Sequence, residues 1–220
     1  MNETLTFARA WDELDPCFRE CLSQAWRALT SRGLPVGSVI SRGDAILTAG
    51  RNRVYDERGG SEPLQRTALA HAEMNAIATL PVDVDLAECE IWSTQEPCSM
   101  CRAAIEFTGI GAVHFLATDP SAQDEGAAFV SSGRSADLWV VVANTLFLHN
   151  VAAVGGLDNP MLAVTATAEP EIAALALRLV RDQTLTRAAE AHMSIEQVLT
   201  ATWDDFTSAA AQRSSRATGS

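Results

Sequence analysis

The chain has 220 residues, of which 47% are hydrophobic and 20% charged, as expected for a globular protein with one α/β domain and an extension. Its formal net charge of −12 opposes binding to nucleic-acid phosphates. No apolar run reaches the roughly 18 residues of a membrane span, and residues 1–9 lack the basic-then-apolar order of a signal peptide. The five cysteines give no disulfide framework. We therefore predict a cytoplasmic protein that does not bind membranes and whose acidity disfavours nucleic acid as a partner.

The first part of the chain predicts a helix followed by a β-hairpin. Residues 15–32 repeat apolar side chains at helical spacing, and Gly33 stands where such a helix would end. Two short apolar runs, 35–40 and 45–49, flank the turn signal at 41–44. These runs predict two antiparallel strands.

A polar stretch, 54–66, follows the hairpin and is long enough to overhang a neighbouring site. The arginines in and beside it are Arg51, Arg53, Arg58 and Arg66, and the acidic residues among them are Asp56, Glu57 and Glu62. This mixture favours a solvated loop of mixed charge over a phosphate-binding cradle.

The most informative motifs are His71-Ala72-Glu73 and Pro97-Cys98-Ser99-Met100-Cys101, whose first metal-binding residues are 27 positions apart. One imidazole and two thiolates hold a zinc ion through three positions and leave the fourth open for water, whereas structural zinc sites use four protein ligands. Glu73 lies two residues after the histidine, so it can exchange protons with that water. The motifs therefore predict His71, Cys98 and Cys101 as zinc ligands and Glu73 as the catalytic acid and base.

The segments around these motifs predict helices and strands in alternation. Apolar residues around His71 follow helical spacing, 90–94 predicts a strand, and 98–107 predicts a helix that ends at Gly109. Further strands are predicted at 112–117 and 138–142. Because a helix separates the third and fourth strands, they should be parallel. We therefore expect an α/β fold, a three-layer α/β/α sandwich with a mixed five-stranded sheet.

The last third of the chain predicts a helical extension. Helical patterns cover 170–193 and 194–212, and Ser194 with Gln197 fits a capping box. We predict a catalytic domain over 1–160, an extension over 161–212 packed on that domain or on a partner subunit, and a disordered tail over 213–220. The apolar surface of the extension favours a homodimer.

The two motifs together resemble the zinc-dependent nucleobase and nucleoside deaminases, whose signature is H-x-E followed by P-C-x-x-C. The resemblance covers roughly residues 15–119 and implies the cytidine deaminase-like fold. It implies that Asn52 binds the base or sugar and that the backbone N–H groups of Ala72 and Cys98 face the substrate. It also implies substrate contacts at Val36, Ala72, Pro97 and Asp119.

These observations predict a zinc-dependent aminohydrolase that releases ammonia from a small nucleobase or nucleoside through a metal-activated water. The motifs look most like the branch that holds guanine deaminases, cytosine deaminases and tRNA adenosine deaminases. This resemblance implies an aminopurine such as guanine as the first candidate substrate, cytosine or cytidine as the second, and tRNA adenosine as the third, because the acidic chain disfavours RNA. The rival interpretation is a non-catalytic protein with a structural zinc ion. Glu73 argues against that rival, since a structural site has no use for a carboxylate beside an open coordination position.

Overall fold

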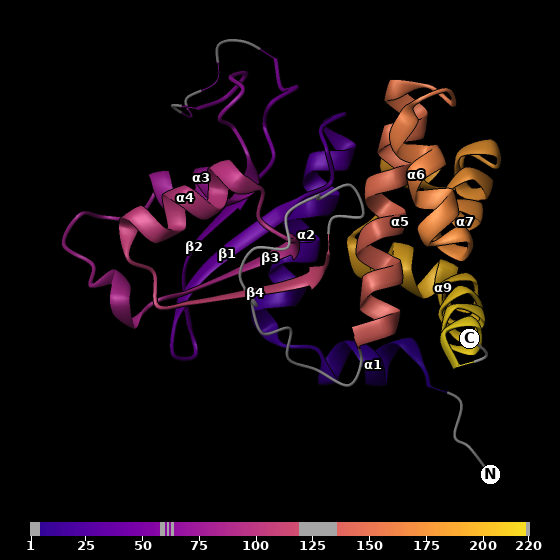
Figure 1. Ribbon diagram of the computed structural model, residues 1–220, viewed down its shortest axis with the longest axis horizontal. Helices are drawn as coiled ribbons and strands as arrows, with labels where there is room; N and C mark the ends of the chain where they lie inside the picture. Colours follow the sequence, from indigo (N-terminus) through magenta and orange to yellow (C-terminus); the bar gives the residue numbers. More distant parts are fainter. Residues whose placement is uncertain (1–4, 58–59, 61, 63, 119–135, 219–220) are drawn as a thin grey trace.

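The structure is a computed structural model that describes residues 5–57, 60, 62, 64–118 and 136–218 (Figure 1). Its elements in chain order are α1 (Phe7–Glu13), α2 (Pro16–Thr30), β1 (Gly37–Arg42), β2 (Ala45–Arg51), α3 (Ala72–Ala78), the 3-10 turn η1 (Leu86–Glu88), β3 (Glu90–Gln95), α4 (Ser99–Thr108), β4 (Ala112–Ala117), α5 (Ala136–Gly155), α6 (Pro160–Ala168), α7 (Pro170–Arg181), α8 (Thr184–Glu190) and α9 (Ile195–Thr218). The predicted first helix, the hairpin, and the strand–helix–strand unit from β3 to β4 are confirmed.

The sheet is mixed, with the strand order β2-β1-β3-β4. Strand β1 is antiparallel to both β2 and β3, and β3 is parallel to β4, as predicted. In the β1–β3 pair Ser38 lies opposite Ser93, and in the hairpin Ser38 lies opposite Gly50. This register brings the end of β2, the start of β1 and the end of β3 to the same edge of the sheet.

Successive residues of each strand point to opposite faces of the sheet, and the two faces are covered by different helices. Val39 and Trp92 belong to the larger apolar core, which includes α2. Their neighbours Ile40 and Ile91 belong to a smaller core with residues of α3 and α4. The sheet therefore lies between α2 on one face and α3 with α4 on the other, the three layers that were predicted (Figure 1).

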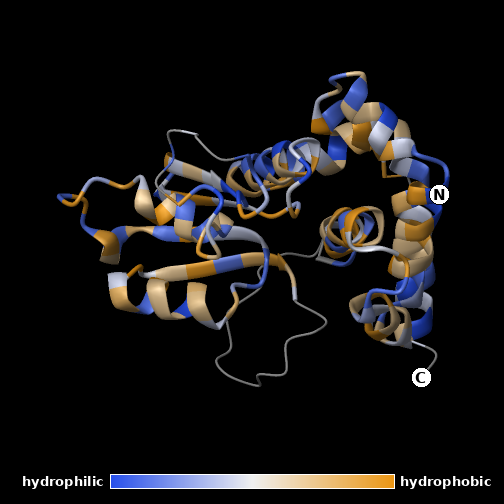
Figure 2. Cartoon of the chain, turned by 90° about the horizontal axis from the view of Figure 1, so that it is seen from above, coloured by the Kyte–Doolittle hydropathy of each residue, from blue (hydrophilic) through white to orange (hydrophobic). Residues whose placement is uncertain are grey.

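The predicted fifth strand, 138–142, is wrong, because these residues lie in helix α5 and the described sheet has four strands. The run Leu138–Val142 is apolar on every side, so it has no helical period to reveal it. Residues Asp137–Gly155 are apolar and long enough to cross a membrane by composition and length alone, but 72% of that window is buried inside the molecule. Figure 2 shows the long hydrophobic stretches of these C-terminal helices. Burial among other helices explains the composition of α5.

The C-terminal helices pack on the rest of this chain. Trp26 of α2 donates a hydrogen bond from Nε1 to the carbonyl oxygen of Met193 at 2.8 Å, and residues of α2, α5, α7 and α9 share one core. The predicted capping box is confirmed: Gln197 N–H donates to Ser194 Oγ, and Ser194 N–H donates to Gln197 Oε1.

The predicted disordered tail from 213 is wrong through residue 218, because α9 continues to Thr218. Arg213 forms ion pairs with Asp137 and Glu169, and Arg216 forms ion pairs with Glu169 and Glu171. These ion pairs tie the last turns of α9 to α5 and to the start of α7. Charges so distant in sequence gave no local signal for the continued helix.

Candidate metal centre and active site

Three potential metal ligands meet at the N-terminal ends of two helices. His71 Nδ1 lies 3.5 Å from Cys98 Sγ and 3.6 Å from Cys101 Sγ, and the three potential ligand atoms all lie within 4.8 Å of one another. No other such group of His, Cys, Asp or Glu side chains occurs among the described residues. Zinc bonds of roughly 2.3 Å to sulfur and 2.0 Å to nitrogen at tetrahedral angles place the two donors about 3.6 Å apart. The donor set therefore fits zinc with one coordination position left for another ligand.

The local backbone explains why the donors converge. His71 is the N-cap of α3, and Cys98 is the N-cap of α4, so each begins its helix as an extended residue. The helix predicted around His71 is shorter than its apolar pattern indicated, because α3 starts only at Ala72. Gly50 of β2 lies so close to α3 that a methyl group there would overlap the carbonyl oxygen of Ala72. A glycine at this position therefore lets the metal-binding end of α3 approach the sheet.

Glu73 lies beside the metal donors and is 3% exposed. Ser93 Oγ donates a hydrogen bond to Glu73 Oε1 at 3.2 Å, and the Cys101 thiol donates to Oε2 at 3.5 Å. Burial raises the pKa of the Glu73 carboxyl because desolvation penalises its charged form. A carboxyl with a raised pKa can accept and return a proton closer to neutral pH than an ordinary glutamate.

The metal donors also perturb one another. Hydrogen bonds from Cys101 and then from His71 lower the pKa of the Cys98 thiol to about 3. The hydrogen bond between His71 and Cys98 raises the pKa of His71, and the separate bond between Cys101 and Cys98, together with burial, raises the pKa of Cys101. Cys98 is therefore the thiol most readily held as thiolate, the form that binds metal.

A cavity of about 130 Å³ opens onto these groups. It is lined by Leu34, Val36, Asn52, His71, Ala72, Glu73, Gln95, Glu96, Cys98 and Phe147. Of the predicted substrate contacts, Val36, Asn52 and Ala72 line the cavity, and Pro97, though buried between two lining residues, does not. The fifth, Asp119, lies outside the described residues.

Sequence reasoning missed four residues of this cavity: Leu34, Gln95, Glu96 and Phe147. Gln95 ends β3, and Phe147 comes from α5, the helix that was predicted as a strand. Gln95 could have been found, because a polar residue at the end of a buried strand, directly before Glu96-Pro97, needs a partner. Phe147 could not have been found, since its position depends on how α5 packs against the sheet.

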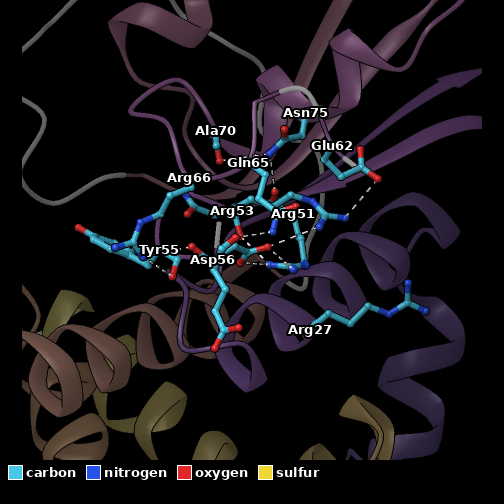
Figure 3. A network of polar contacts seen from close by, with 12 residues as sticks. Arg27, Arg51, Arg53, Tyr55, Asp56, Glu62, Gln65, Arg66, Ala70 and Asn75 are labelled. Atoms are coloured by element: carbon cyan, nitrogen blue, oxygen red, sulfur yellow. Dashed lines mark hydrogen bonds and ion pairs between the residues drawn. The ribbon is translucent and has the colours of Figure 1, made fainter. Parts of the chain in front are cut away.

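Charged side chains in and beside the loop after β2 form an ion-pair network with one another, and those that the structure describes do not line the cavity (Figure 3). Asp56 accepts two hydrogen bonds from Arg51, at 2.8 and 2.6 Å, and Arg53 also pairs with it. Arg66 donates to the carbonyl oxygens of Tyr55 and Asp56. The described arginines of this loop are therefore paired within it, in agreement with the predicted mixed-charge loop, and none of the described loop residues from Arg53 to Arg66 lines the cavity.

Residues 12–117 match the family model of the cytidine and deoxycytidylate deaminase zinc-binding region. A cytosine deaminase from Candida albicans is 36% identical over 93 residues, which are 40% of this chain and 55% of that protein. A tRNA-specific adenosine deaminase from Rickettsia bellii is 30% identical over 104 residues, 46% of this chain and 68% of that protein. The matched segment thus spans between about half and two thirds of these relatives.

Solved structures include one described as guanine deaminase from Nitrosomonas europaea. It is 19% identical with a TM-score of 0.48, and the match covers 67% of this chain and 89% of that one. Likeness at this level does not indicate a substrate.

Proposed function

The chain belongs to the zinc-dependent cytidine and deoxycytidylate deaminase family, and we propose that it removes the amino group of a small nucleobase or nucleoside by hydrolysis. The single observation that carries this proposal is Glu73, buried beside three zinc donors in a cavity that also contains Asn52. A structural zinc site would contain neither an open position nor a neighbouring proton acceptor.

The proposed mechanism assigns the proton transfers to Glu73. His71, Cys98 and Cys101 would hold the zinc ion, which when bound would supply the Lewis-acid chemistry that lets water lose a proton near neutral pH. Glu73 takes one proton from the attacking water and gives it to the ring nitrogen. It then takes the remaining proton from the new hydroxyl group on the ring carbon and passes it to the amine, which leaves as ammonia as the C–N bond breaks and a carbonyl forms. Ser93, which donates to Glu73 Oε1, holds the carboxylate so that Oε2 faces the metal donors.

Asn52 supplies the proposed recognition of the ring edge. Its Oδ1 accepts a hydrogen bond from Val54 N–H at 3.1 Å, so the amide hydrogens on Nδ2 are left for a ligand. No acceptor for these hydrogens occurs among the described residues. The substrate should therefore present a carbonyl oxygen or an unprotonated ring nitrogen to Asn52.

Two ring systems satisfy this requirement. An aminopurine such as guanine remains the first candidate on the motif pattern, as the sequence predicted. Cytosine is the second, supported by the 36% identity to the Candida albicans cytosine deaminase. Both carry an amino group on a ring carbon beside a ring nitrogen, the arrangement that the proposed proton transfers need.

Adenosine in tRNA is the third candidate, named by the Rickettsia bellii relative. The charge of the chain, −12, opposes it. Arg51 is next in sequence to the cavity residue Asn52 and is paired with Asp56. Arg102 is paired with Glu96, which itself lines the cavity. A phosphate backbone at the cavity mouth would have to displace these carboxylates.

A deamination screen tests the proposed function. Zinc-loaded protein is assayed for ammonia release from guanine, adenine, cytosine, their nucleosides and nucleotides, and a tRNA anticodon stem. We expect turnover of a small molecule that is largely insensitive to added salt, because no phosphate contact is involved. Release of ammonia from none of them would contradict the deaminase assignment, and far more efficient turnover of the RNA would contradict a small-molecule substrate.

We also propose a homodimer located in the cytoplasm. The apolar surface includes Val154 and Leu157, 62% and 67% exposed, at and just after the end of α5, and a subunit contact would cover it. Light scattering should give about twice the chain mass of 23.5 kDa. A monomer mass that does not change with concentration would refute the dimer.

A further inference from the structure

Gln95, which lines the cavity, belongs to a buried pair of amide side chains that connects the sheet to α5. Gln95, at the end of β3, donates a hydrogen bond from Nε2 to Asn144 Oδ1 of α5 at 3.0 Å. Gln95 is 7% exposed and Asn144 is 3% exposed. Burying an amide is unfavourable unless its polar atoms are bonded, so a pair placed here demands an explanation beyond packing.

The bond to Asn144 fixes which end of the Gln95 amide remains available. With Nε2 bound to α5, the carbonyl oxygen Oε1 is the acceptor left for the cavity, which Gln95 lines. Within the part of the chain that the structure describes, no donor reaches this oxygen. Gln95 therefore offers an acceptor to whatever occupies the cavity.

Gln95 and Asn52 lie on either side of Val36 along one row of the sheet edge. Extending the registers Ser38–Gly50 and Ser38–Ser93 by two residues places Val36 between Asn52 and Gln95, and Asn52 N–H donates to the carbonyl oxygen of Val36 at 3.0 Å. Two strand spacings separate their backbones by about 10 Å. A ring between them can accept from Asn52 and donate to Gln95.

Phe147 closes the cavity on the side of α5. It follows Asn144 by three residues, which places both on the same helix face, and it also lines the cavity. The wall that contains Gln95 and Phe147 thus combines one acceptor with an aromatic surface. Among the described residues, the neighbouring Glu96 also lines the cavity but is paired with Arg102, so this wall offers no unpaired set of polar groups for the several hydroxyls of a sugar.

We propose that Gln95, held by Asn144, accepts the ring N–H that only a free base carries and so makes this enzyme selective for free bases over nucleosides. This inference rests on the proposed deaminase function. In cytosine and guanine the nitrogen that bears the sugar in a nucleoside carries a hydrogen in the free base. A nucleoside would leave the Gln95 oxygen without a donor and would bring its sugar against Phe147. Sites that bind a polar hydrogen reject analogues that lack it by several orders of magnitude, so a preference for bases on the order of 10²-fold or more is expected.

The first test compares kcat/KM for cytosine with cytidine and for guanine with guanosine. Gln95→Met, of similar length but without an acceptor amide, should reduce kcat/KM for the bases and shrink the base-to-nucleoside ratio at least ~10-fold. Gln24→Leu is the control, because Gln24 is also a buried amide but lies on α2 and bonds Glu20. It should leave the ratio unchanged.

The second test concerns Asn144 as a positioning residue. Asn144→Asp keeps an acceptor for Gln95 Nε2 and should retain the base preference, whereas Asn144→Leu should lose it. Equilibrium Kd values of the same bases and nucleosides, measured by calorimetry with Glu73→Ala protein that cannot turn them over, should follow the same order.

The outcomes separate the two proposals. Nucleosides that are bound or deaminated as well as bases, or a ratio unchanged by Gln95→Met in folded protein, would overturn the role of Gln95 while leaving the deaminase assignment intact. A wild-type protein that deaminates no base or nucleoside would overturn the proposed function, and in that case preferential binding of bases would still support the role of Gln95.

Discussion

His149 of α5 makes stability depend on pH in a way that can be calculated. It is 3% exposed, and neither ring nitrogen has a hydrogen-bond partner among the residues that the structure describes. Burial lowers the pKa of His149 from 6.5 to about 4, because the charged imidazolium loses its hydration. The cavity beside it is also lined by Arg32 and Glu190.

A folded-state pKa below the unfolded value means that the unfolded chain binds the proton more readily. The contribution of neutral, buried His149 to the free energy of unfolding is therefore fully present above pH 6.5 and is lost as the pH falls toward 4. One pKa unit corresponds to about 1.4 kcal/mol, so the shift of His149 amounts to about 3 kcal/mol over this interval. Removing the imidazole should remove this part of the acid sensitivity.

The assay is urea unfolding of wild type and His149→Leu, followed by tryptophan fluorescence at pH 7.5, 6.5, 5.5 and 4.5. The free energies of unfolding should diverge below pH 6.5, with the variant losing about 3 kcal/mol less than wild type as the pH approaches 4. Identical pH dependence of the two proteins would refute the reasoning, because the remaining acidic groups are common to both.

Four further substitutions test the site and its support. Cys98→Ala and Cys101→Ala should each lower zinc content well below one ion per chain by elemental analysis, whereas Cys89→Ala, buried outside the donor set, should keep it. Asp56→Asn should lower the free energy of unfolding by about 3 kcal/mol or more in urea titrations, because it leaves a largely buried guanidinium without its carboxylate. Gly50→Ala should lower both zinc content and melting temperature, since the added methyl group pushes α3 off the sheet; unchanged zinc content would contradict the close approach.

The metal centre could be predicted almost completely from sequence because its residues lie within two short motifs. His71, Cys98 and Cys101 come together as the spacing indicated, and Glu73 lies beside them. The motif predicts the ligands from local sequence alone, because a P-C-x-x-C segment places two thiols at one helix N-terminus wherever that helix lies in the fold. Strands and caps with clear periodicity or turn residues were predictable for the same reason.

Features that depend on tertiary packing could not be predicted. Helix α5 is apolar all round because other helices and β4 enclose it, and that enclosure removes the amphipathic pattern that distinguishes helix from strand. Two residues of α5 were missed with it: Phe147, which lines the cavity, and Asn144, which holds the lining residue Gln95. The last turns of α9 depend on Arg213 pairing with Glu169, 44 positions away in sequence.

Glu73→Ala tests the central claim most directly, with Glu106→Ala, an exposed glutamate on α4, as the matched control. Both proteins should contain about one zinc ion per chain by elemental analysis, since neither loses a metal ligand. Ammonia release from the best base should fall by at least ~10²-fold in Glu73→Ala and stay at the wild-type level in Glu106→Ala. Substantial turnover by zinc-loaded Glu73→Ala would contradict the assignment of Glu73 as the group that moves the protons.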